Sequence, residues 1–248
     1  MALSMLTIAA RPPDDEHLFG HSKAEYFSSG VEGSLILIAA ISIGIAAIKR
    51  LIAPKPLDQA GMGLAVSGIA SLINFAVARL LLSVGKKHNS ITLEADARHL
   101  MTDVWTSIGV IGGVGLVALT GLKFFDPIVA LAVATNIVWS GFHIVSRSVQ
   151  GLMDTALSTE EPNMLLNVLE KYKDLGVQFH AIRTSQAASR RFISIHVLVP
   201  GNWTVKRGHQ LMERIKDDIR SILSNVTVFT HIEPVEDPIS MQDIELDR

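Results

Sequence analysis

Two side chains near the middle of the chain, His99 and Asp103, have the chemistry to bind a divalent metal ion together. They lie four residues apart, at the start of the apolar run Leu100–Leu122. If this stretch is helical, the two side chains share one face, about one turn apart. An ionisable pair at a membrane span is costly and therefore indicates a functional site. The spacing alone also fits a helix N-terminal turn, in which Asp103 favours the helix dipole and His99 is interfacial.

A second set of candidate metal ligands lies in a polar stretch near the start of the chain. Asp14 precedes His17 by three residues, and His17 precedes His21 by four, so the three side chains could reach one ion. From the spacing alone, a solvated polar loop is the alternative interpretation.

A third set lies in the C-terminal part of the chain. Three of its histidines fall in or beside predicted strands, and a fourth falls early in a predicted helix. Each histidine taken alone is more often structural or exposed than a ligand. The set consists of His180, His196, His209, His231 and Glu233.

The composition restricts the kinds of site that the chain can build. Of its 248 residues, 48% are hydrophobic and 19% are charged, and the mean hydropathy is +0.35, which is more apolar than an ordinary soluble domain. The absence of cysteine excludes thiolate zinc sites, disulfides and thiol catalysis. Any metal site must therefore use His, Asp and Glu. The net charge of −2 gives no sign of a nucleic-acid partner.

The apolar residues are concentrated in the first part of the chain, which we expect to be an α-helical membrane domain over residues 1–152. Four spans are predicted, at about residues 31–52, 57–84, 100–122 and 127–146, with Gly85–Arg98 as a polar connector. An even number of spans places both ends of the domain on the same side of the membrane. Basic residues favour the cytoplasm for that side: Arg11, Lys23, Lys86, Lys87, Arg98 and Arg147.

Residues 153–235 have the patterns of a small α+β domain. Helical periodicity covers Pro162–Lys173 and Lys206–Leu223, and three stretches are strand-like: Val177–Thr184, Arg191–Val199 and Val226–Ile232. The predicted order is α-β-β-α-β, typical of a small open sheet with helices on one face. We expect residues 236–248 to be a disordered acidic tail.

The sequence resembles the cation diffusion facilitator family of metal/proton antiporters over nearly its whole length. The resemblance rests on Asp14-Asp-Glu-His17-Leu-Phe-Gly-His21-Ser-Lys-Ala-Glu25, on His99-x-x-x-Asp103 and on Leu152-Met-Asp154, in that order. It implies a helical membrane domain, with six spans in the family and four here, followed by a cytoplasmic domain of ferredoxin-like or metallochaperone-like type. Because the resemblance begins where the second of the family's six spans should end, we expect this polypeptide to lack the first two spans, of which the second supplies two ligands of the family's transport site.

The resemblance also implies a role for each candidate residue. His99 and Asp103 would be half of a tetrahedral transport site, and Asp14, His17 and His21 would hold a metal in a loop. His180, His196, His209, His231 and Glu233 would form a cytoplasmic metal site, with Glu233 standing where an aspartate is common. Lys23 and Asp154 would form a charge interlock that ties subunits together.

The resemblance predicts a homodimeric efflux protein in the lipid bilayer of the bacterial inner membrane, with its C-terminal domain in the cytoplasm. Zinc is the expected cargo, exchanged for protons, because histidine and carboxylate ligands suit it; cobalt, iron(II), nickel, manganese and cadmium ions are alternatives. We expect no enzymatic activity and no prosthetic group. A different function stays open, that of a non-transporting metal-binding or dimerisation partner, or a membrane-anchored metal sensor.

Overall fold

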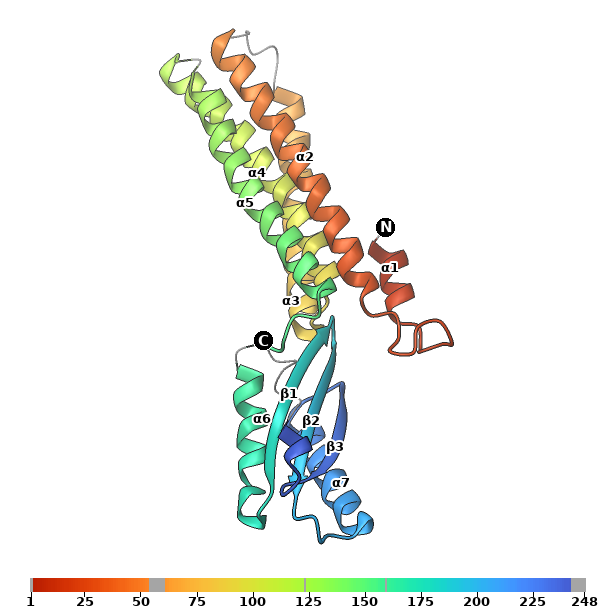
Figure 1. The fold of residues 1–248 in the computed structure, drawn as a ribbon. Helices are drawn as coiled ribbons and strands as arrows, with labels where there is room; N and C mark the ends of the chain where they lie inside the picture. Colours follow the sequence, from red (N-terminus) through yellow and green to blue (C-terminus); the bar gives the residue numbers. More distant parts are fainter. Residues whose placement is uncertain (1, 54–60, 123, 159, 242–248) are drawn as a thin grey trace. The chain divides into compact units, whose positions relative to one another are not determined.

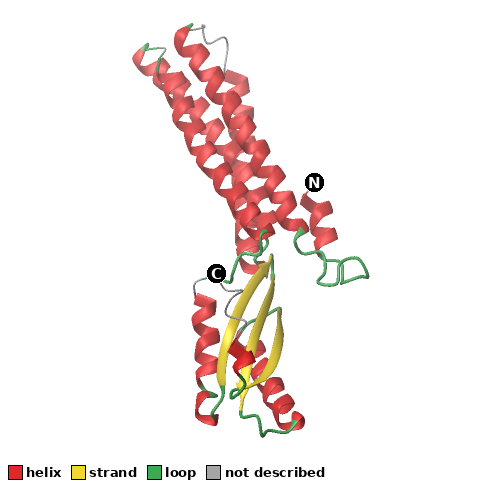
Figure 2. Ribbon diagram, viewed as in Figure 1, coloured by secondary structure: helices red, strands yellow, loops and turns green. Residues whose placement is uncertain are grey.

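The computed structural model describes residues 2–53, 61–122, 124–158 and 160–241. The chain divides into two compact units, Met1–Leu152 and Met153–Arg248. The first is helical, and the second combines helices with a sheet (Figure 2). Each unit is described by itself below.

The first unit contains a short helix, α1 (Ala2–Ala9), and four long ones. These are α2 (Ala24–Ile52), α3 (Gly61–His88), α4 (Ile91–Thr120) and α5 (Phe125–Leu152), and all four are long and apolar enough to cross a membrane (Figure 1). The prediction of four apolar helices followed by a small α/β domain is confirmed. The first predicted span begins earlier than expected, at Ala24, and residues 57–60 of the second lie outside the described residues.

The four long helices pack through small residues and leave many large apolar side chains facing outward. α2 packs on α5, α3 packs on α4, and α4 also contacts α5 and α2. Gly33 of α2 is buried against Ile144 and Val145 of α5, a close approach that only a small residue permits. Outward-facing residues such as Leu35 and Ile38 are more than half exposed, as expected of side chains that contact lipid.

The structure contradicts the predicted polar connector Gly85–Arg98, because this stretch consists of two helix ends. Helix α3 continues to His88, and α4 begins at Ile91, where the Ser90 side chain accepts a hydrogen bond from the Leu93 amide. No glycine or proline interrupts the chain between Ile91 and His99. His99 and Asp103 therefore lie in the third and fourth turns of α4, so the interpretation as a helix N-terminal turn is wrong.

Two ion pairs connect the long helices near their ends. The Arg147 guanidinium of α5 pairs with the Glu94 carboxylate of α4, and Arg50 of α2 donates to Asp126 of α5 at 2.8 Å. Both carboxylates are largely buried, with side-chain exposures of 11% for Glu94 and 9% for Asp126. Removing one partner of such a pair would leave an uncompensated buried charge, which is strongly destabilising.

The second unit is a three-stranded sheet with two helices on one face. It contains α6 (Glu160–Glu170), a 3-10 turn η1 (Lys173–Leu175), β1 (Gln178–Ala187), β2 (Arg190–Val199), α7 (Val205–Ile222) and β3 (Val226–Pro234). The sheet order is β1-β2-β3, with β1 antiparallel and β3 parallel to β2. Ile193, Ile195 and Val197 of β2 are fully buried in the core that also includes residues of α6 and α7. The alternate residues of β2 therefore lie on the face that the helices leave open.

Residues 236–241, predicted as the start of a disordered tail, make defined contacts. The Glu236 carboxylate accepts a hydrogen bond of 2.9 Å from the Gly201 amide, and the Ser240 hydroxyl donates to the Pro234 carbonyl at 2.9 Å. Ser240 is buried. These polar contacts are local, and the hydrophobic pattern of the segment does not reveal them. Residues 242–248 of the predicted tail lie outside the described residues.

The packing of α2 on α5 predicts unequal effects for two glycine substitutions in α2. In Gly33→Ala, the new Cβ would lie 2.9 Å from Val145 Cγ2 and 3.0 Å from Ile144 Cγ2, so the helices must separate. Overpacking of this kind costs about 1–3 kcal/mol. We expect a lower melting temperature for the detergent-purified protein, measured by the loss of helical circular dichroism. Gly44→Ala is the control, because nothing lies within 4 Å of its Cβ, and an equal loss in both variants would contradict the packing argument.

Candidate metal sites

Strand pairing places three histidines in a row across the sheet of the second unit. His180 of β1 is the direct partner of His196 in β2, and His196 is the direct partner of His231 in β3. Direct partners on neighbouring strands have side chains on the same face and close together. The ring centroids are 5.1 Å apart for His180 and His196, and 5.0 Å apart for His196 and His231. The row lies on the open face of the sheet.

Glu233 brings a carboxylate to this row from two residues further along β3. One of its oxygens, Oε2, lies 2.7 Å from His180 Nε2 and 3.4 Å from His196 Nδ1. His180, His196 and Glu233 each offer one ligand atom, and these atoms all lie within 4.8 Å of one another. The three side chains are 12–19% exposed, so water has only partial access to them.

A β-bulge next to His180 sets the direction of its side chain. The register of β1 on β2 shifts between His180 and Arg183, and Ala181 has a φ of +46°, which is unusual for alanine. Bulges of this kind turn a side chain and are frequent beside functional sites. The Nδ1 atom of His180 is buried and has no hydrogen-bond partner among the described residues.

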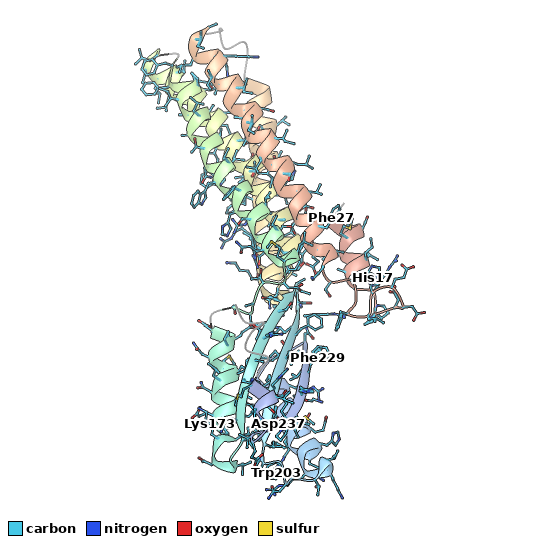
Figure 3. The ribbon with its side chains drawn as sticks, viewed as in Figure 1. His17, Phe27, Lys173, Trp203, Phe229 and Asp237 are labelled. Carbon is cyan, nitrogen blue, oxygen red and sulfur yellow. The ribbon has the colours of Figure 1, made fainter. Side chains whose placement is uncertain are left out.

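The two remaining predicted ligands of this domain lie at the edge of the cluster. His231 is 66% exposed, with Nε2 3.6 Å from Glu233 Oε1. His209, on the first turns of α7, is exposed and lines a cavity of about 370 Å³ together with Glu233. Trp203 lines the same cavity from the turn before α7, where Figure 3 labels it. The compact part of the cluster thus consists of His180, His196 and Glu233.

The loop before α2 gathers Asp14, His17 and His21 around one point. Asp14 Oδ1 lies 3.4 Å from His17 Nδ1, and Asp14 Oδ2 lies 3.3 Å from His21 Nε2. The ligand atoms of all three residues are within 4.8 Å of one another. His17, labelled in Figure 3, is half exposed, as is Asp14, whereas His21 is 11% exposed. This loop can hold an ion at the surface of the first unit.

The backbone of the same loop prepares Asp14 as an anion. The amides of Glu16 and His17 donate to Asp14 Oδ1 at 3.1 and 2.7 Å. The hydrogen bond from the His17 amide is the main cause that lowers the pKa of Asp14 below its ordinary value. The carboxylate is therefore held in the form that a cation requires.

The transport pair predicted from the sequence lies on one face of α4. His99 and Asp103 are four residues apart in a continuous helix, and both are exposed. Within the described residues, neither belongs to a group of three or more potential ligands. The pair thus shares one helix face, and among the described residues no third His, Asp or Glu places a ligand atom close enough to form a group with it.

Two acidic residues near this face were missed in the sequence. Asp96 lies on the His99 side of α4, and Glu32 of α2 is close enough for the charges of Glu32 and Asp96 to interact. Glu32 Oε2 is buried and has no hydrogen-bond partner among the described residues. The available signal was an ionisable residue within an apolar helical run, the same signal that identified Asp103.

The two residues of the predicted charge interlock belong to different units. Lys23 Nζ lies 3.5 Å from the Leu152 carbonyl within the first unit. Asp154 accepts a hydrogen bond of 2.9 Å from the Ser185 hydroxyl within the second. Each residue thus has a local contact of its own.

Comparison with known proteins gives a match over both units. The family model of the cation efflux transmembrane domain matches residues 1–153, and that of the cation efflux protein cytoplasmic domain matches residues 157–235. An uncharacterized transporter of Synechocystis is 48% identical over 242 residues, which cover 98% of this chain and 78% of the relative. The cation-efflux pump FieF of Citrobacter koseri is 28% identical over 232 residues, covering 94% and 77%.

A solved structure is also similar to part of the chain. The metal-bound C-terminal domain of the CzcD transporter from Thermotoga maritima is 24% identical and covers 33% of this chain and 99% of its own. The TM-score is 0.30, too low to support an inference from this likeness.

The sheet cluster predicts that His180→Ala weakens zinc binding by the protein. The substitution removes the nitrogen that lies closest to Glu233, and we expect a loss of at least about 100-fold in affinity, by isothermal titration calorimetry. Ser194→Ala is the matched control, because Ser194 is an alternate residue of β2 on the same open face. If both variants lose affinity equally, or if neither does, the cluster is not a zinc site.

The lowered pKa of Asp14 predicts the pH dependence of the loop. The pKa of Asp14 is lower in the folded protein than in the unfolded chain. The stabilisation of the loop by the Asp14 carboxylate is therefore fully present above the ordinary aspartate pKa and is lost as the pH falls through the lowered pKa. We expect the NMR shift of the His17 amide to titrate below the pH at which an ordinary aspartate titrates. Asp14→Asn, which cannot ionise, is expected to abolish this titration. A midpoint at or above the ordinary value would contradict the analysis.

Proposed function

The chain belongs to the cation diffusion facilitator family, and from this premise we propose that it exports zinc from the cytoplasm in exchange for protons. It is a membrane protein and a cation efflux transporter of that family, with its second unit in the cytoplasm. Zinc and the proton exchange are our additions. The observation that carries them is the His99–Asp103 pair on one exposed face of a membrane-spanning helix.

The donor types of this pair support a zinc cargo. An imidazole nitrogen and a carboxylate oxygen are common zinc ligands, and the tetrahedral zinc shell has four positions. The pair supplies two of these positions, so other donors complete the shell. The outward direction of the pair on α4 leaves room for them. Cobalt, iron(II), nickel, manganese and cadmium ions are alternative cargoes that the same donor types can bind.

Histidine gives proton exchange a physical basis. A metal and a proton compete for the same imidazole nitrogen, so binding of one releases the other. A site that exposes this histidine to each side of the membrane in turn therefore couples the outward movement of the metal to the inward movement of protons. Asp103 contributes negative charge, which attracts the cation.

The loop and sheet clusters have supporting roles in this proposal. Asp14, His17 and His21 bind metal near the membrane surface. His180, His196 and Glu233 bind regulatory zinc in the cytoplasmic unit, with His209 and His231 as further ligands. We propose that the protein is a homodimer of the bacterial inner membrane, which agrees with the bacterial origin of the relatives. In that dimer, Lys23 and Asp154 form a charge interlock.

A second function is favoured by the contrast between the sites. Among the described residues, three ligand atoms lie within 4.8 Å of one another at the sheet cluster, whereas the His99–Asp103 pair on α4 belongs to no such group. A metal-binding partner or a membrane-anchored sensor needs only the first of these. In such a protein, zinc binding to the second unit would shift its conformational equilibrium without any transport.

The transport proposal predicts that His99→Ala abolishes zinc-dependent proton flux. The experiment uses the full chain in proteoliposomes that contain a pH-sensitive dye, with zinc added outside. We expect Asp103→Asn to cause a similar loss, because each variant removes one donor from the cargo site. His88→Ala is the control, since His88 lies at the end of α3 outside every ligand group found among the described residues.

Two outcomes would contradict this assignment. Unchanged flux in His99→Ala would show that the pair on α4 does not bind the cargo. If the unmodified chain binds zinc but produces no flux in proteoliposomes, the partner or sensor function is correct instead.

A further inference from the structure

A second feature of the membrane unit lies on the other side of α4 from His99 and Asp103. It is a cavity of about 540 Å³ between α3, α4 and α5, a size typical of ligand pockets. It is open at one side and runs from the helix ends near Lys86 toward the middle of the bundle. Its lining residues are Leu82, Lys86, Glu94, Arg98, Met101, Thr102, Trp105, Asn136, Ile137, Trp139, Ser140 and His143.

The charges in this cavity are unbalanced. The carboxylate of Glu94 is already matched by Arg147, which lines a small adjoining cavity. Lys86 and Arg98 have no carboxylate partner and no side-chain hydrogen bond among the residues that the structure describes. Two positive charges therefore remain at one end of the cavity, with the polar His143 beside them. A ligand that neutralises them must carry negative charge.

The positions of Lys86 and Arg98 along their helices show at which depth in the membrane the two positive charges lie. Lys86 lies two residues before the end of α3, and Arg98 lies just before the apolar run that begins at Leu100. Both belong to the end of the bundle at which α5 finishes with Leu152, which is the cytoplasmic end. Basic pockets between membrane helices at this level suit anionic lipid headgroups.

Away from its basic end, the cavity is lined by large apolar side chains together with the polar Thr102, Asn136 and Ser140. Met101, Trp105 and Ile137 line its deeper part, and Trp139 is 75% exposed at its edge. A soluble anion would interact only with the basic residues at one end. A phospholipid has a phosphate for those residues and an acyl chain for the apolar side chains further in. Phospholipids are also abundant around any membrane-spanning helix.

We propose that this cavity binds an anionic phospholipid of the cytoplasmic leaflet. Lys86 and Arg98 bind the headgroup phosphate, and an acyl chain lies along Met101 and Trp105. The lipid would bridge α3 and α5 across α4, without touching the opposite face that carries His99 and Asp103. It is thus a structural ligand of the transport domain, separate from the metal path.

The proposal is tested by native mass spectrometry of the delipidated full chain. Phosphatidylglycerol and phosphatidylcholine are added in equal amounts, and we expect preferential retention of phosphatidylglycerol. If each of the two cavity-lining basic residues that contact the headgroup contributes about a fivefold gain in affinity, Lys86→Gln with Arg98→Gln is expected to lower phosphatidylglycerol binding by roughly 25-fold. The charge-conserving pair Lys86→Arg and Arg98→Lys is expected to retain binding and shows that the site tolerates substitution.

Lys87→Gln is the matched control, because it removes one positive charge from the same helix end without lining the cavity. We expect it to change phosphatidylglycerol binding less than twofold. An equal loss in Lys87→Gln, or no loss in the double glutamine variant, would overturn the proposal. Excess inorganic phosphate is expected to leave the lipid bound; complete displacement would show that the cavity is a site for free phosphate instead.

Discussion

The ion pair between Glu94 and Arg147 determines how the rest of the membrane unit is arranged around α4. An apolar helix among apolar helices and lipid can rotate about its axis at little cost, because most of its faces are alike. The buried Glu94 carboxylate must face Arg147 of α5, and this fixes the rotation of α4. At about 100° per residue, His99 and Asp103 then lie roughly 140° and 180° around the helix from Glu94. The proposed metal ligands and the cavity beside Glu94 are thereby kept on opposite sides.

In the cytoplasmic unit, strand register has the same controlling role. Ile195 and Val197 of β2 are fully buried, so His196 between them must lie on the open face. A shift of β2 by one residue would bury His196 and expose both neighbours, which the hydrophobic core forbids. The core formed with α6 and α7 therefore positions the histidine row, although no histidine belongs to it. Function on one face of the sheet depends on packing at the other face.

Much of this structure could be predicted from the sequence, because apolar runs and alternation report directly on burial. Four spans, the α-β-β-α-β order and the pairing of His99 with Asp103 on one face required no tertiary information. The start of α4 was mispredicted, since the residues from Ile91 to Arg98 are polar enough to resemble a loop although the helix continues through them. The partner of Glu94 could not be predicted, because it depends on helix packing, whereas Glu233 was grouped with His180 and His196 only through the family resemblance. Glu32 was overlooked although its signal was present.

The ligand groups differ in what a metal must displace. Asp14 is already in contact with His17 and His21, and Glu233 with His180, so a cation entering either cluster replaces existing hydrogen bonds between preorganised ligands. His99 and Asp103 have no such partner among the described residues, and both are exposed. Preorganised clusters favour tight and lasting occupancy, because little conformational entropy is lost on binding. A cargo site must also release its ion, and an open pair in which protons compete for the imidazole is suited to release. The physical contrast between the sites is therefore consistent with the proposed division between regulatory and transported metal.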